Sequence, residues 1–167
     1  FMRRARNAAM ANPPTLPFSA SLVSGERIHS AAEFTERIGR AAAGFAALGL
    51  GPGDCAALLL RNDFALLEAS LAAVRLGAYA VPINWHFKAD EVAYVLADCG
   101  AKVLVAHADL LSAVADAVPA GVKVLQVATP PEVASAYGVA PDDGRPLAGA
   151  TVWEDWLQQH DIWQGPT

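Results

Sequence analysis

The feature of this sequence that most limits its fold is an alternation of short apolar runs with longer segments of helical periodicity. The apolar runs occupy residues 55–60, 78–83, 102–105 and 122–127. Such runs are typical of strands that are covered on both faces of a sheet, and Pro82 favours an edge or irregular position for the second run. Strand–helix–strand units of this length need right-handed crossovers, which align the strands in parallel. We therefore predict an α/β fold in which a doubly wound, mostly parallel sheet is flanked by helices.

A small hairpin and a capped helix are predicted ahead of these units. Residues 21–29 hold two short apolar stretches around a glycine turn, which indicates a hairpin. Ser30 and Glu33 then have the spacing of a capping box, in which the serine accepts a backbone hydrogen bond and the glutamate reaches back. The helix that they begin has apolar residues at helical spacing and is expected to end at Gly49.

The helices between the strands are predicted from apolar spacing and from the residues at their ends. Asn62 or Asp63 caps the helix that follows the first strand. A third helix is expected within 88–98, and a fourth begins at Asp109 and covers 110–118. The inward side chains of the helix after the first strand are predicted to be Phe64, Leu67, Leu71 and Val74.

Composition divides the chain into three parts. Residues 1–20 are expected to form an irregular arm with a short helix, and residues 21–128 form the α/β subdomain. Residues 129–167 form a connection and a terminal helix, and the Pro- and Gly-rich stretch 129–150 is expected to lack regular structure. A second capping box at 151–154 opens the terminal helix, whose tryptophans are expected to pack in the core or at an interface.

Charge and cysteine content exclude several classes of protein. The formal net charge is −5 and no basic stripe is present, which argues against nucleic acid as a partner. Hydrophobic residues make up 54% of the chain and charged residues 17%, so a disordered chain is excluded. No apolar run approaches the about 20 residues that span a bilayer. Cys55 and Cys99 lie in apolar segments and are predicted to be free thiols, which favours a reducing cytoplasm.

Two short motifs do not carry the chemistry that they suggest at first sight. The glycines of 49–53 follow a helix and precede a strand, whereas a phosphate loop follows a strand and opens a helix. His107 and Asp109 are too few ligands for a zinc site, which needs three or four. We therefore predict a turn at the first position and no metal site at the second.

The loop over 84–88 is the most polar and aromatic segment after any of the predicted strands. Ligands of an open parallel sheet gather beyond the carboxyl ends of its strands. Trp85, His86 and Lys88 can hold a nucleotide or an acyl group by stacking and by charge. The same residues also fit a solvated strand-to-helix loop, in which Asn84 is a cap and Trp85 packs over the sheet edge. The residues alone leave both interpretations open.

Three segments, in this order, resemble one known family. They are AAAGFAALGLGPG over 41–53, LAAVRLGAYAVPIN over 71–84 and DEVAYVLAD over 90–98. Together they resemble the N-terminal part of the AMP-forming acyl-CoA synthetases, or fatty-acid–CoA ligases. Luciferases and the adenylation domains of peptide synthetases belong to the same adenylate-forming superfamily. The resemblance spans roughly residues 21–128, which is most of the chain, and implies a subdomain of a larger adenylate-forming domain.

This resemblance implies an ATP-dependent reaction in two steps. A carboxylate attacks the α-phosphate of ATP to give an acyl-adenylate and pyrophosphate, and the thiol of coenzyme A then displaces AMP. ATP, Mg²⁺ and coenzyme A are the implied cofactors of the full-length enzyme, and a carboxylic acid, in first place a fatty acid, is the implied substrate. In some bacterial relatives a basic residue after this strand contacts the nucleotide phosphates of coenzyme A, and His86 and Lys88 stand in that position. No residue is predicted to be catalytic or to bind a metal.

The phosphate loop and the other nucleotide-binding motifs of the family have no counterpart in residues 1–167. We therefore expect a chain that is truncated before the phosphate loop, inactive alone, and unable to bind the cofactors tightly. Its expected partner is the remainder of the synthetase, through an apolar face that is otherwise exposed or self-associates. A free-standing nucleotide-binding or interaction module with the same fold, and a degenerate enzyme that ends naturally at Thr167, remain as alternatives.

Overall fold

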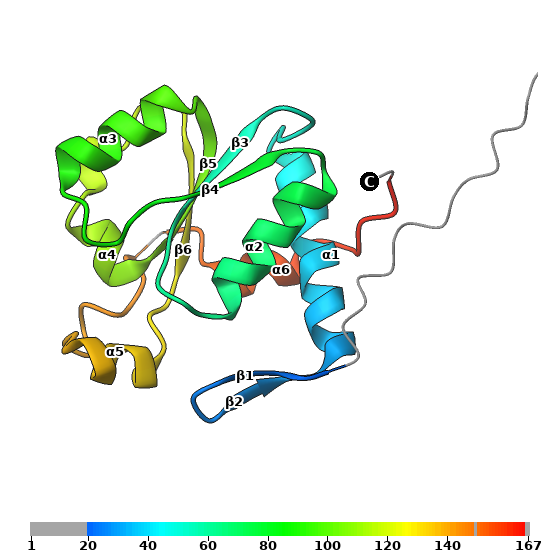
Figure 1. Ribbon diagram of the computed structural model, residues 1–167, viewed down its shortest axis with the longest axis horizontal. Helices are drawn as coiled ribbons and strands as arrows, with labels where there is room; N and C mark the ends of the chain where they lie inside the picture. Colours follow the sequence, from blue (N-terminus) through cyan, green and yellow to red (C-terminus); the bar gives the residue numbers. More distant parts are fainter. Residues whose placement is uncertain (1–19, 149, 166–167) are drawn as a thin grey trace, which may run out of the picture.

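The computed structural model describes residues 20–148 and 150–165, so most of the arm predicted for 1–20 lies outside the described residues. The hairpin and the strand–helix units form as predicted (Figure 1). The elements in chain order are β1 (Leu22–Ser24), β2 (Arg27–His29), α1 (Ala31–Ala47), β3 (Cys55–Leu59), α2 (Phe64–Arg75), β4 (Tyr79–Pro82), α3 (Ala89–Asp98), β5 (Ala101–His107), α4 (Ala108–Ser112), the 3₁₀-helix η1 (Ala115–Ala117), β6 (Lys123–Val127), α5 (Pro131–Tyr137) and α6 (Trp153–Gln158).

The main sheet is parallel, with the strand order β4-β3-β5-β6. β1 and β2 pair with each other as a separate antiparallel hairpin. β4 lies at the edge of the main sheet, which confirms the position that Pro82 indicated, since proline cannot donate to a second neighbouring strand. The carboxyl ends of all four strands therefore meet along one edge, where a ligand site is expected.

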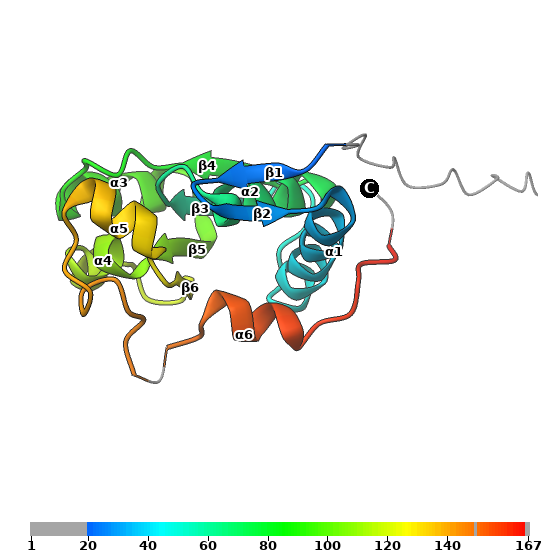
Figure 2. The same ribbon diagram turned by 90° about the horizontal axis from the view of Figure 1, so that it is seen from below.

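Helices cover both faces of this sheet, which confirms the doubly wound fold. Figures 1 and 2 show α1, α2 and α6 on one side and α3 and α4 on the other. Successive residues of β3 alternate between the two cores: Ala56 and Leu58 pack with the first group of helices, and Ala57 and Leu59 pack with the second. The described helices thus cover both faces of the sheet, and an exposed apolar face that contacts the rest of the synthetase stays a prediction.

α2 turns a different side to the core from the one predicted. Leu67 and Val74 were expected to face inward, but they are 44% and 61% exposed. The buried side chains are Phe64, Ala65, Glu68, Ala69, Ala72 and Ala73. The small alanines let α2 lie close to α1, Leu66 and Leu71 are partly buried against the same core, and Leu67 and Val74 lie on the outside. The prediction was right for Phe64 and for Leu71, which is partly buried against the core, and wrong for Leu67 and Val74.

The predicted helix caps hold in part. Ser30 Oγ accepts a hydrogen bond from the backbone N–H of Glu33 at 3.2 Å, as expected, but the Glu33 carboxylate lies 3.3 Å from His29 Nδ1 instead. Asp63 occupies the N-cap position of α2 without a side-chain capping bond. At α6 the predicted capping box is wrong, because Val152 is the N-cap and Glu154 pairs with Arg37.

Two predictions about the second half of the chain were also wrong. The helix expected over 110–118 is split into α4 and η1, and it begins after His107 rather than with Asp109 as its cap. The stretch 129–150 contains the helix α5, which starts at Pro131 and ends at Gly138 in the left-handed conformation. Proline at a helix start and glycine after a helix end are ordinary helix signals, and the composition of the stretch hid them.

The cysteines and the helix lengths agree with the other expectations. Cys55 and Cys99 are free thiols, as predicted, although both are half-buried rather than fully enclosed. No helix within the described residues is both long and apolar enough to cross a membrane.

Candidate functional site

Polar and aromatic side chains from all four strands of the main sheet gather at its carboxyl edge. Arg61 follows β3, Trp85 follows β4, Asp109 follows β5 and Thr129 follows β6. The sequence indicated this edge as the place for a ligand, and the structure shows that most of these side chains contact one another. The candidate functional site consists of this group together with the loop over 84–88.

Arg61 is the centre of the group. Its side chain is 6% exposed, and Nη1 lies 2.7 Å from Asp109 Oδ2. Thr129 Oγ1 donates to the other oxygen of Asp109 at 2.6 Å, which holds that carboxylate in place. The Arg61 guanidinium also lies over two rings, at 5.2 Å from the centroid of Trp85 and 4.8 Å from that of Tyr137. A cation between two aromatic rings and a carboxylate is well stabilised despite its burial.

A second polar group lies beside the first and joins the hairpin to the sheet. The backbone N–H of Arg61 donates to Nδ1 of His107 at 3.1 Å, so a neutral His107 carries its proton on Nε2. That nitrogen lies 3.6 Å from Asp63 Oδ2. Arg27, from β2, forms ion pairs with Asp63 and with Glu132 of α5. The hairpin is therefore attached to the carboxyl edge through charged side chains.

The Asp63 carboxylate is strongly stabilised in its charged form. Burial alone would raise its pKa, but its contacts with His107 and Arg27, the N–H of Phe64 and the charge of Arg27 outweigh burial and lower the pKa to about 2. Because the pKa in the folded state is below its ordinary value near 3.9, Asp63 stabilises the fold above that value. This contribution is lost as the pH falls through about 4 toward 2.

Replacing Asp63 with asparagine should therefore flatten the acid dependence of stability. Between pH 5 and pH 2 we expect the unfolding free energy of the original chain to fall by about 2 kcal/mol more than that of Asp63→Asn. Urea titrations at several pH values measure this difference directly. Equal losses for the two proteins over this pH range would show that the Asp63 ion pairs do not stabilise the fold.

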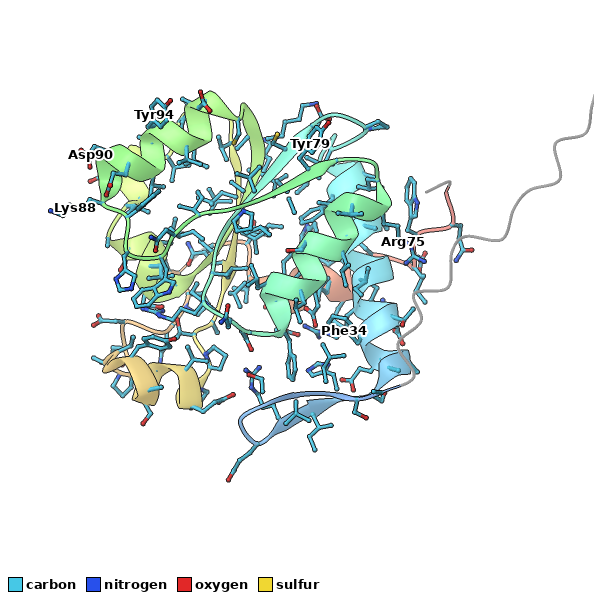
Figure 3. All side chains as sticks on the ribbon, viewed as in Figure 1. Phe34, Arg75, Tyr79, Lys88, Asp90 and Tyr94 are labelled. Atoms are coloured by element: carbon cyan, nitrogen blue, oxygen red, sulfur yellow. The ribbon has the colours of Figure 1, made fainter. Side chains whose placement is uncertain are left out.

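The structure places both residues that the sequence singled out, His86 and Lys88, on the exposed loop between β4 and α3. The ring of His86 contacts that of Trp85 in a tilted arrangement with a centroid distance of 3.5 Å, and the backbone N–H of His86 donates to Asn84 Oδ1 at 3.1 Å. Lys88 is the N-cap residue of α3, where its backbone N–H donates to Glu91 Oε2 at 2.9 Å. Its side chain points away from the body of the protein (Figure 3).

Several residues of the site were not identified from the sequence. The sequence placed Arg61, Asp109 and Thr129 at strand ends, where ligands gather, but singled out only the loop over 84–88, and Tyr137 lay in a stretch that was expected to be irregular. The signal for these residues in the sequence is a polar side chain directly after a buried strand. This signal does not show which side chains from other strands will contact it. In the described part of the chain, no three His, Cys, Asp or Glu side chains gather as a metal ion would need.

Comparisons with known proteins agree with the fold and with the resemblance. The family described as AMP-binding enzyme matches residues 8–163. A medium/long-chain fatty-acid–CoA ligase of Mycobacterium tuberculosis, FadD6, is 46% identical over 77 residues, which cover 46% of this chain and 13% of that protein. A feruloyl-CoA synthase of Amycolatopsis is 37% identical over 112 residues, covering 63% of this chain and 23% of the synthase. The chain thus spans less than a quarter of either relative.

Solved structures show the same arrangement of strands and helices. The anthranilate CoA ligase AuaEII matches with a TM-score of 0.70 at 21% identity, over 92% of this chain and 27% of that protein. A benzoate CoA ligase from Burkholderia xenovorans matches with a TM-score of 0.69 at 20% identity, over 87% of this chain and 26% of the ligase. Because the family match extends over nearly the whole sequence, the chain belongs to the AMP-binding enzyme family, the adenylate-forming enzymes that its motifs resemble.

Proposed function

We propose that this chain is part of a ligase that joins a carboxylic acid to coenzyme A and releases AMP and pyrophosphate. The observation that carries the proposal is the family match over residues 8–163, together with relatives that are named as CoA ligases. ATP with Mg²⁺ supplies the adenylyl group that activates the acid, and we assign no residue of this chain to that step. A fatty acid is the first candidate substrate because the fatty-acid–CoA ligase FadD6 is 46% identical over its aligned region.

Within that ligase, we assign the loop over 84–88 to the nucleotide phosphates of coenzyme A. Lys88 carries a positive charge on an exposed side chain, and His86 offers an exposed imidazole two residues away. Both groups donate hydrogen bonds of the kind that phosphate oxygens accept. Asp90 and Glu91 follow in the first turn of α3, so the net attraction for an anion is moderate. His86 and Lys88 therefore fit a contact that contributes part of the binding free energy of coenzyme A and not most of it.

The experiment is a kinetic comparison in the ligase that contains this chain. Replacing both His86 and Lys88 with alanine should raise the KM for coenzyme A about tenfold, which corresponds to about 1.4 kcal/mol. Exchange of pyrophosphate into ATP reports the first step alone and should keep its rate, because neither side chain is assigned to adenylation. The KM for pantetheine, which lacks the nucleotide, should also stay unchanged.

Lys102→Ala is the matched control. Lys102 is an exposed lysine at the amino end of β5, at the opposite edge of the sheet, where it pairs with Asp54 at 2.8 Å. Its removal changes the net charge as Lys88→Ala does and should leave the KM for coenzyme A unchanged. If the double variant and this control give the same KM as the original enzyme, the loop does not bind the nucleotide phosphates.

A further inference from the structure

We propose that Arg61 is a positioning residue for coenzyme A: held by Asp109, it supports Trp85, and through Trp85 it fixes His86 in the loop. This inference rests on the function proposed above for His86 and Lys88. It adds a residue that does not touch coenzyme A but sets how well the loop binds it.

Arg61 follows β3 and is fixed by residues at the ends of β5 and β6. Its Nη1 pairs with Asp109 after β5, and Asp109 is in turn held by Thr129 after β6. The backbone N–H of Arg61 itself donates to His107, the last residue of β5. The side chain is almost fully buried, so its position is set by the sheet and not by solvent. It is therefore a rigid platform at the carboxyl edge.

The platform supports the loop through ring contacts. The Arg61 guanidinium lies 5.2 Å from the centroid of the Trp85 ring, and the Trp85 and His86 rings contact each other in a tilted arrangement, with centroids 3.5 Å apart and an angle of 30° between the rings. Tyr137 also belongs to this cluster. Its ring centroid lies 4.8 Å from the Arg61 guanidinium and 5.1 Å from the ring centroid of Trp85. A continuous line of contacts thus leads from the sheet to the exposed imidazole.

The chemistry of the contact requires an arginine. The Nε atom of Arg61 is buried and, among the described residues, has no hydrogen-bond partner. A buried donor without a partner costs stability, so hydrogen bonding alone does not explain why this residue is an arginine. A planar guanidinium stacks on aromatic rings, whereas the ammonium of lysine is a compact point charge. Arg61→Lys therefore keeps the positive charge beside Asp109 and removes the flat surface beneath Trp85.

The burial of Arg61 separates its role from direct phosphate binding. The guanidinium is enclosed and already paired with a carboxylate, so it has no free face for a phosphate group. Any effect of Arg61 on coenzyme A must then pass through Trp85 and the loop. The effect should appear in the KM for coenzyme A and not in the rate of adenylation.

The test uses Arg61→Lys in the ligase that contains this chain. We expect the KM for coenzyme A to rise about three- to tenfold, with kcat and the pyrophosphate exchange rate unchanged. The KM for pantetheine, which has no nucleotide for the loop to bind, should also be unchanged. Trp85→Leu removes the ring itself and should raise the KM for coenzyme A to a similar degree, which keeps the test valid if Arg61→Lys fails to fold.

Arg37→Lys is the matched control. Arg37 is also a largely buried arginine with a buried partner, since its Nε lies 2.6 Å from Glu68 Oε1, but it belongs to α1 and pairs with α2 rather than with the loop. This variant should lower stability as Arg61→Lys does and leave the KM for coenzyme A unchanged. Such a result separates a specific effect on the loop from general loosening of the fold.

The possible outcomes separate the two proposals. If the His86 and Lys88 double variant raises the KM for coenzyme A while Arg61→Lys and Trp85→Leu do not, the positioning role is wrong and the loop assignment stands. If none of these variants changes it, the loop assignment fails and the positioning role fails with it. A parallel rise in the KM for pantetheine, or an equal rise for Arg37→Lys, would also overturn the positioning role.

Discussion

Replacing Glu68 with alanine is expected to lower the free energy of unfolding by about 3–5 kcal/mol. The Glu68 carboxylate is fully buried on α2, where it accepts hydrogen bonds from Arg37 Nε at 2.6 Å and Arg37 Nη2 at 3.0 Å. It also accepts one from Trp153 Nε1 at 3.0 Å, which joins α6 to α1 and α2. Its removal leaves a buried guanidinium and an indole N–H without this partner, and breaks the junction of three helices.

The loss of stability is large because the partners of Glu68 stay buried after its removal. Their burial without this carboxylate costs more than the net attraction of the original pair. Domains of this size are stable by about 5–15 kcal/mol, so the variant should be close to unfolding. If the loss comes from the buried Nε side of the Arg37 guanidinium, which no longer has a partner, replacing both members of the pair with apolar residues, Glu68→Leu with Arg37→Met, should restore part of the stability. A double variant that is no more stable than Glu68→Ala would show that shape, and not charge, determines the cost.

Glu154→Ala is the control for this prediction. Glu154 contacts the same arginine, with its Oε1 2.7 Å from Arg37 Nη2, but its side chain is 57% exposed. Solvent screens an exposed pair, so its loss should cost at most about 1 kcal/mol. Urea unfolding followed by circular dichroism compares the two variants. Equal costs for Glu68→Ala and Glu154→Ala would show that burial does not set the strength of these ion pairs.

The strands and their order of appearance could be predicted because their signals are local. Continuous apolar runs, helical spacing and glycines after helices each lie within a few residues of the element that they define. Pro82 favoured an edge or irregular position for its strand, and β4 lies at one edge of the sheet, since the missing N–H is a property of that residue alone. The hairpin over 21–29 and the N-cap at Ser30 belong to the same class of local signal.

The orientation of α2 could not be predicted in the same way. Apolar spacing identified Leu67 and Val74 as inward residues, yet the helix buries its alanines and Glu68. The reason is that a buried glutamate depends on partners that are distant in sequence. Arg37 comes before α2 and Trp153 comes long after it. No pattern within the helix shows that such partners will neutralise the charge.

The candidate site shows the same division between local and distant information. The sequence located the loop with His86 and Lys88, because a polar aromatic segment after a strand is visible in the chain itself. It did not show Arg61 beneath Trp85, because that contact joins the ends of different strands. The loop residues could thus be predicted from a local pattern, whereas the contact with Arg61 that supports them depends on the topology of the sheet.

The isolated chain is expected to release no pyrophosphate, which is the largest difference expected between it and the ligase of which we propose it is a part. Adenylyl transfer depends on positioning and on donors that stabilise the charge of the phosphates. Loss of a single such donor typically costs about 10²–10³ in rate. This chain spans 13% of the fatty-acid–CoA ligase and 27% of the anthranilate ligase that it matches, and none of its residues is assigned to that role.

Pyrophosphate release therefore tests whether this chain is a supporting part of a ligase. The purified 167-residue chain, incubated with ATP, Mg²⁺ and a fatty acid, should release pyrophosphate no faster than a sample without protein. The ligase that contains the chain should release it in the same assay. Acid-dependent pyrophosphate release by the chain alone would show that it carries the adenylation machinery itself, contrary to the supporting role proposed for it.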